Sequence, residues 1–187
     1  MRTACWPAIL SYGISGILDA FDGYAARRLN QSTRFGAMLD MLVDRCATMC
    51  LITCLATFYP DYSFLFQLSM IIDVTSHWFH MHTSISGGAQ SHKAIKLEGN
   101  VILRWYYHNR IVLFLMCAGN ELFYSALYVH HFIKQPTVLH IEPFYWIACL
   151  MAPIAFAKSF ISVIQLFAAA ANLARLDGEE RSKAKRS

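Results

Sequence analysis

Long apolar stretches alternate with short polar segments along this chain. Five of them approach the roughly 20 residues that a helix needs to cross a bilayer: residues 4–18, 38–58, 62–81, 111–132 and 144–173. The first is short, and the acidic residues after it indicate that its helix continues past the hydrocarbon. No stretch remains for a soluble domain. The pattern therefore predicts an all-α fold, a polytopic membrane helix bundle with five spanning helices in a single domain over residues 1–187.

Basic residues fall on one side of this predicted bundle. They lie in the loop after the first helix (Arg27, Arg28, Arg34), before the fourth helix (Lys93, Lys96, Arg104) and in the tail (Arg175, Arg181, Lys183, Lys185, Arg186). The opposite side has little beyond Arg2 and Lys134. Loops rich in Lys and Arg stay in the cytosol, and five crossings from an outside start place all three segments there. We therefore expect residues 174–187 to form a basic cytosolic tail.

Composition agrees with a membrane protein and excludes other classes. Hydrophobic residues make up 56% of the chain and charged residues only 15%, whereas a soluble domain carries about 25% charged residues. This apolar content excludes disorder. A net charge of +4 without a basic stripe argues against nucleic acid as a partner. The cysteines indicate no secreted disulfide framework, because Cys46, Cys50 and Cys54 repeat at helical spacing inside an apolar run.

Four aspartates gather where the first two predicted helices reach the cytosol. Asp19 and Asp22 are three residues apart, and Asp40 and Asp44 are four apart, so each pair projects from one face of its helix. The short loop between the helices makes an antiparallel hairpin that brings the carboxylates together. Ionisable groups at membrane depth are costly and indicate function. The alternative is that these acids only form salt bridges with nearby arginines, although four acids at paired helical spacings exceed what helix capping requires.

The aspartate group predicts a particular chemistry. Four like charges in a small space repel one another unless a cation lies among them, and carboxylate oxygens favour magnesium, manganese or calcium over zinc. Magnesium keeps several waters and is shared with substrate phosphates, which fits the arginines in the adjoining loop. Gly23 would let a substrate approach the backbone, and Gly36 would permit close helix packing.

Other polar residues in or near the apolar stretches admit two interpretations. Four histidines match no zinc spacing and are better explained as amphipathic residues at a helix end than as transition-metal ligands: His77, His80, His82 and His92. Asp73 and Glu121 lie inside apolar segments. For both, pairing with a buried polar partner is favoured over direct chemistry.

The aspartate segment resembles the signature of the CDP-alcohol phosphatidyltransferase family. From Asp19 to Asp44 the chain matches D-x-x-D-G-x-x-A-R, eight residues, then G-x-x-x-D-x-x-x-D at every fixed position. Further segments are similar to the animal members of this family that form phosphatidylinositol: residues 31–45, 73–78, 118–124 and 158–165. Family members have six spanning helices. Here only 18 residues precede Asp19, so we expect the chain to lack the first of the six.

The resemblance implies a reaction and a metal set. CDP-diacylglycerol and myo-inositol would give phosphatidylinositol and CMP, with two divalent ions, Mg²⁺ or Mn²⁺, as cofactors. Asp19, Asp22 and Asp40 would hold one ion. Asp19, Asp40 and Asp44 would surround the second, and Asp44 would also accept the proton of the attacking alcohol.

Further expectations come from the same resemblance. Gly23, Arg27 and Thr33 would bind the head of CDP-diacylglycerol. Independently of the resemblance, Arg104 and Arg110 precede the fourth span near the cytosolic face, a position that fits inositol or phosphate contacts and equally well the positive side of the membrane. We expect a multi-pass protein of the endoplasmic reticulum membrane with its active site facing the cytosol, and a possible homodimer. The tail residues 183–187 are similar to a K-x-K-x-x retrieval signal, or form a basic patch for anionic lipid. Two alternatives remain: a sister enzyme with another alcohol acceptor, or an inactive truncated membrane subunit.

Overall fold

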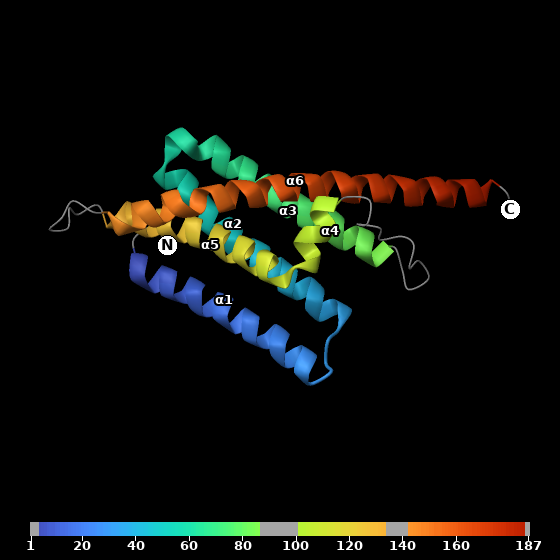
Figure 1. Ribbon diagram of the computed structural model, residues 1–187, viewed down its shortest axis with the longest axis horizontal. Helices are drawn as coiled ribbons and strands as arrows, with labels where there is room; N and C mark the ends of the chain where they lie inside the picture. Colours follow the sequence, from blue (N-terminus) through green and yellow to red (C-terminus); the bar gives the residue numbers. More distant parts are fainter. Residues whose placement is uncertain (1–3, 87–100, 134–141, 186–187) are drawn as a thin grey trace. The chain divides into compact units, whose positions relative to one another are not determined.

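The computed structural model describes residues 4–86, 101–133 and 142–185, and within them the chain is helical with no strand (Figure 1). The elements are α1 (Cys5–Arg28), α2 (Arg34–Phe58), the 3₁₀ helix η1 (Pro60–Tyr62), α3 (Ser63–Ser86), α4 (Val101–His108), α5 (Arg110–Phe132) and α6 (Pro143–Ala184). The predicted all-α fold is confirmed. Several residues named above lie outside the described part of the chain: Arg2, His92, Lys93, Lys96, Lys134, Arg186 and the side chain of Arg110.

Three of the described helices are long and apolar enough to cross a membrane: Arg34–Phe58, Ile111–Phe132 and Pro143–Ala184. This confirms the class of a helical membrane protein. The two other predicted spans form helices as well, since α1 and α3 have 24 residues each. Their crossing of the bilayer stays a prediction.

Two helices continue well beyond their apolar stretches. α1 reaches Arg28, ten residues past the apolar part that ends at residue 18. α6 has 42 residues and runs to Ala184, which at about 1.5 Å per residue is twice the thickness of a bilayer core of about 30 Å. Basic side chains in the last turn of each helix favour this continuation, because they lie near the negative end of the helix dipole.

The chain divides into two compact units. Unit 1 comprises residues 1–70 and 119–153, and unit 2 comprises residues 71–118 and 154–187. The helices α3, α5 and α6 contribute residues to both units. Unit 1 contains the whole of α1 and α2, and therefore all four aspartates of the signature.

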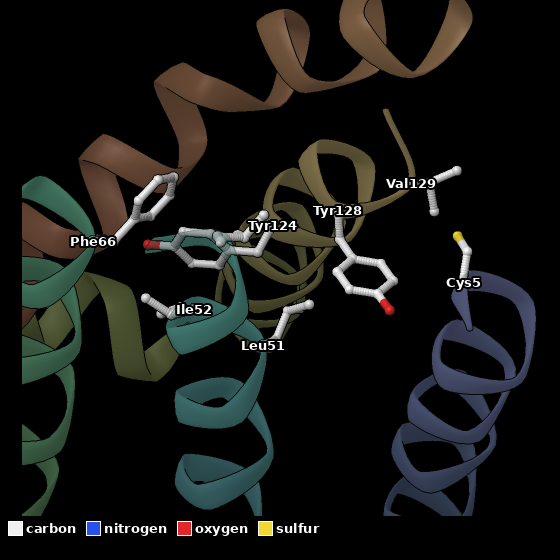
Figure 2. Packing of buried hydrophobic residues seen from close by; sticks show 8 residues of the cluster. Cys5, Leu51, Ile52, Phe66, Tyr124, Tyr128 and Val129 are labelled. Carbon is white, nitrogen blue, oxygen red and sulfur yellow. The ribbon is translucent and has the colours of Figure 1, made fainter. Parts of the chain in front are cut away.

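The core of unit 1 is a cluster of apolar side chains from four helices. Figure 2 shows this packing: Cys5 of α1, Leu51 and Ile52 of α2, Phe66 of α3, and Tyr124, Tyr128 and Val129 of α5; Leu55 of α2 completes the cluster. Lipid tails are as apolar as these side chains, so close van der Waals packing stabilises their association. The cluster holds the second half of α2, beyond the aspartates, against α5.

Among the described side chains of α1, those that reach this core lie in its first turns. Cys5 is buried in it, and Ala8, Ile9 and Tyr12 pack against it. Further along the same helix the apolar side chains are exposed, as with Ile17 at 59%. Core packing therefore anchors the start of α1, whereas its acidic end extends beyond that contact.

Unit 2 contains buried polar groups of α3 and α6. The Lys158 ammonium lies 3.1 Å from a carboxylate oxygen of Asp73, with side chains only 7% and 13% exposed. The predicted pairing of Asp73 with a buried polar partner is thus confirmed. His77 lies in the same cluster, with its Nδ1 2.7 Å from the Asp73 carbonyl oxygen and 3.5 Å from the same carboxylate oxygen.

Two histidines of α3 have contacts within the protein. The His80 ring stacks on Tyr107 at 5.7 Å between ring centres, and His77 contacts Asp73. In the described part of the chain, the group of side chains able to hold a metal contains aspartates and no histidine.

Candidate active site

Local hydrogen bonds build the hairpin that carries the aspartates. α1 ends in a turn in which the Leu29 and Gln31 amides donate to carbonyls of the preceding helical turn, both at 2.9 Å. Asn30 adopts a left-handed conformation with φ 52°, which asparagine tolerates better than most residues. α2 then runs back antiparallel to α1 (Figure 1). The short loop therefore makes the hairpin that the sequence predicts.

Thr33 determines where α2 begins. Its backbone is extended, and its hydroxyl accepts a hydrogen bond of 2.9 Å from the Gly36 amide, the arrangement of a helix N-cap. A Cβ atom on Gly36 would lie only 3.1 Å from that hydroxyl. Gly36 therefore leaves room for the cap, a reason for this glycine that differs from the helix packing expected from the sequence.

Three of the four aspartates come together. Asp19, Asp22 and Asp40 each offer one carboxylate oxygen, and these oxygens lie within 4.8 Å of one another. A magnesium ion with bonds of about 2.1 Å spans oxygens up to about 4.2 Å apart, so small side-chain rotations close the set around one ion. The donors are all hard oxygens, and they fit a divalent cation of this class.

Asp44 lies outside that group of three. Its Oδ2 atom is 3.6 Å from Nη2 of Arg45, and it is one helical turn beyond Asp40. Among the described residues this is the one ion pair to any of the four aspartates. The alternative of simple salt bridging therefore has a recorded ion pair to support it at Asp44.

The electrostatics of the cluster favour a bound cation. Asp19 follows the apolar part of α1. Burial, then a hydrogen bond with Asp40, then the negative charges of the neighbouring aspartates raise the pKa of Asp19 to about 7. Like charges this close resist joint ionisation. A divalent ion between them would remove that cost.

A cavity of about 350 Å³ opens beside these carboxylates. Its lining is Asp19, Asp22, Gly23, Ala26, Arg27, Gln31, Ser32, Thr33, Gly36, Ala37, Leu39, Asp40 and Val43. Six of the seven predicted site residues thus line this cavity, and the seventh, Asp44, is not among the lining residues. The sequence interpretation missed Ser32 and Ala37, and it included Ala26 only as a fixed position of the family signature. Both missed positions could have been found from the sequence, because Ser32 adjoins the capping residue Thr33 and Ala37 adjoins Gly36.

Arg27 supplies the positive charge of the cavity. Its Nη1 atom would lie 3.4 Å from a Cβ atom on Gly23, so the guanidinium covers the backbone just after Asp22. A guanidinium is a planar fork that binds phosphate oxygens through two parallel hydrogen bonds. The cavity therefore combines three carboxylates that could hold a metal ion with a guanidinium of the kind that binds phosphate.

Fold and site together define a helical membrane protein with an acidic cavity suited to a divalent metal and a phosphate group. The chain belongs to the CDP-alcohol phosphatidyltransferase family, whose model matches residues 1–175. The matched residues contain the complete hairpin.

Curated relatives cover almost the whole chain. A human CDP-diacylglycerol–inositol 3-phosphatidyltransferase is 55% identical over 97% of this chain and 86% of its own length. The Drosophila melanogaster protein of the same name is 49% identical over 92% of this chain and 75% of its own length. That of Candida albicans is 45% identical over 94% and 74%. No solved structure matches the chain.

Proposed function

We propose that this protein transfers the phosphatidyl group of CDP-diacylglycerol to myo-inositol, forming phosphatidylinositol and CMP. The observation that carries this proposal is the convergence of three aspartate oxygens within 4.8 Å in a cavity that Arg27 also lines. Such a cavity suits a pyrophosphate that bridges a nucleotide and a lipid. The choice of inositol is supported by the names of the relatives reported above.

The aspartates would hold the cofactor. Asp19, Asp22 and Asp40 are the ligands proposed for one divalent ion, and Asp44 would join Asp19 and Asp40 at a second. Mg²⁺ or Mn²⁺ fits oxygen ligands of this kind. When bound, such ions neutralise charge on the pyrophosphate and stabilise the departing CMP.

The reaction exchanges one phosphorus–oxygen bond for another. The inositol hydroxyl attacks the phosphorus that carries diacylglycerol, and the bond from that phosphorus to the CMP phosphate breaks. Asp44 would take the hydroxyl proton, a contribution of roughly 10²–10⁴-fold for a positioned base. Arg27 would hold a phosphate oxygen, while the backbone at Gly23 and the cap at Thr33 would leave room for the head of the lipid.

The membrane arrangement forms part of the same proposal. The cavity would lie at the cytosolic edge of the bilayer, so that the acyl chains stay in lipid while inositol arrives from water. We propose a location in the endoplasmic reticulum membrane, with residues 174–187 as a cytosolic tail of the single domain, and a homodimer as the assembled form. The basic side chains of the tail support the cytosolic assignment.

An assay of labelled inositol tests this function. Microsomes that contain the full chain, in cells without a phosphatidylinositol-forming enzyme, receive CDP-diacylglycerol, labelled inositol and increasing Mn²⁺ or Mg²⁺. We expect labelled lipid, equimolar CMP and an absolute metal requirement. Asp22→Asn should abolish both products at every metal concentration, whereas Asp61→Asn, a change at an exposed aspartate of η1, should alter neither the products nor the metal requirement. Lipid formed only from another alcohol would overturn the choice of acceptor, and no product from any alcohol would support the inactive subunit.

A further inference from the structure

Glu121 is a carboxylate inside an apolar helix. It belongs to the part of α5 that is long and apolar enough to span a membrane. Its two oxygens accept from two hydroxyls of distant segments: the Tyr12 hydroxyl donates to Oε2, and Thr48 Oγ1 donates to Oε1 at 3.2 Å. A carboxylate at membrane depth is costly and marks a functional residue. These contacts confirm that Glu121 has polar partners, and they raise the question of what the arrangement does.

The two donors stand on the helices that carry the aspartates. Tyr12 precedes Asp19 by seven residues on α1, which is two turns, so both project from one face. Thr48 follows Asp44 by four residues on α2, which is one turn, and its hydroxyl also contacts the Asp44 carbonyl oxygen at 3.0 Å. Glu121 therefore links α1 to α2 on the face that leads to the site. All of these residues belong to unit 1.

Tyr12 is the last point at which α1 packs against the core before the aspartates. Cys5, Ala8 and Ile9 precede it in that contact. Beyond it, Ile14, Ile17 and Leu18 are 56–61% exposed. Core contacts of α1 in unit 1 thus end at Tyr12, and the contact of its hydroxyl with Glu121 is the last one before the hydrogen bond between Asp19 and Asp40 at the site itself.

We propose that Glu121 is a positioning residue for the metal site. By holding Tyr12 and Thr48 on one carboxylate, it sets the separation of α1 and α2 and hence the distance from Asp19 and Asp22 to Asp40. Groups that hydrogen-bond directly to metal ligands change metal affinity or activity by 10–100-fold when removed, and we expect a change within this range for Glu121, which bonds to neighbours of the ligands on both helices. This inference rests on the proposed function only for the identity of the metal-dependent reaction, since its main test measures metal binding without substrate.

The test measures Mn²⁺ binding by the purified full chain in lipid nanodiscs. The electron paramagnetic resonance signal of free Mn²⁺ reports how much of the ion remains unbound. Glu121→Ala should weaken binding 10–100-fold, and Tyr12→Phe and Thr48→Val by smaller factors. Thr48→Ser keeps the hydroxyl and should bind as the wild type does. The matched control is Glu142→Gln, a half-exposed carboxylate of unit 1 whose recorded ion pair is with His130, and it should leave the Mn²⁺ affinity unchanged.

The transfer reaction supplies a second readout. Because Glu121 acts through position and touches no reacting atom, saturating Mn²⁺ should restore most of the kcat of Glu121→Ala. A folded Glu121→Ala that binds Mn²⁺ normally would overturn the proposal, even if its thermal stability falls. Should that variant not fold, Tyr12→Phe and Thr48→Val decide the question by the same measurement. If the wild-type protein binds Mn²⁺ but transfers nothing to inositol, the proposed function is refuted. The Mn²⁺ affinities of the variants then still decide whether Glu121 positions the metal site.

Discussion

Removal of either partner of the buried Asp73–Lys158 pair should strongly destabilise the protein. The two charges are 3.1 Å apart and almost fully buried. A single substitution therefore leaves one charge without its main partner, at a cost of about 3–5 kcal/mol in the free energy of unfolding. Replacement of both by residues of similar shape is often close to neutral, so Asp73→Asn with Lys158→Met should cost much less than the two single variants together.

The two single variants should differ from each other. His77 lies 3.5 Å from the Asp73 carboxylate oxygen that pairs with Lys158. Lys158→Met therefore leaves the carboxylate beside the polar ring of His77, whereas Asp73→Asn leaves the buried ammonium beside a neutral amide. We expect Asp73→Asn at the upper end of the range and Lys158→Met at the lower end.

Thermal unfolding in detergent measures these effects. For a chain of this size each kcal/mol shifts Tm by about 2–4 °C, so a single variant should lose about 6–20 °C and the double variant only a few degrees. His80→Gln, at a ring contact in the same unit, is a suitable comparison for a polar change without loss of a charge. Additive losses in the double variant, or single variants within 1 °C of the wild type, would refute the assignment of the pair as a buried and mutually dependent one.

Two further predictions concern the hairpin. Thr33→Ala should lower the free energy of unfolding by about 0.5–2 kcal/mol through loss of the cap, and Thr33→Ser should retain the wild-type value. Gly36→Ala should add little to Thr33→Ala, because both substitutions disturb the same hydrogen bond. Additive losses in the thermal unfolding of the double variant would argue against a shared contact. Asp44→Asn should abolish transfer to inositol while the inserted protein still binds Mn²⁺ through Asp19, Asp22 and Asp40, and normal turnover in the inositol assay would remove Asp44 from the mechanism.

The hairpin was predictable because its determinants are local. Residues three or four apart on a helix share a face whatever the helix packs against, so the spacing of Asp19 with Asp22 was enough to pair them. A short polar loop between two apolar stretches then brings the second helix back beside the first. The position of Thr33 in the cavity was expected from the family resemblance, but its role as a cap became visible only from the backbone conformation.

The partners of the buried acids could not be predicted. Asp73 and Lys158 are 85 residues apart in the chain, and Glu121 is 109 residues from Tyr12. Helical periodicity gives the face on which a side chain lies, but not which other helix covers that face. The cost of burial indicates that a partner exists, and tertiary packing alone identifies it.

The helix ends show a second limit of sequence patterns. Apolar stretches mark what lies in lipid, but a helix ends where its backbone hydrogen bonds end. In α6 the apolar stretch was expected to end at residue 173, whereas the helix continues to Ala184. Asp177 and Arg181, and Glu179 and Lys183, stand four residues apart there, and opposite charges at this spacing support a solvated helix.

The cap at Thr33 has a consequence for the direction of the side chains that follow it. Successive residues of a helix are rotated by about 100° around its axis. Because Thr33 fixes the first residue of α2, it fixes the azimuth at which Asp40 leaves the axis, seven residues later. Deletion of one residue between them would swing Asp40 and Asp44 together through about 100°, away from α1, although every ligand would still be present. The count of residues from cap to carboxylate is therefore as much a part of this site as the carboxylates themselves.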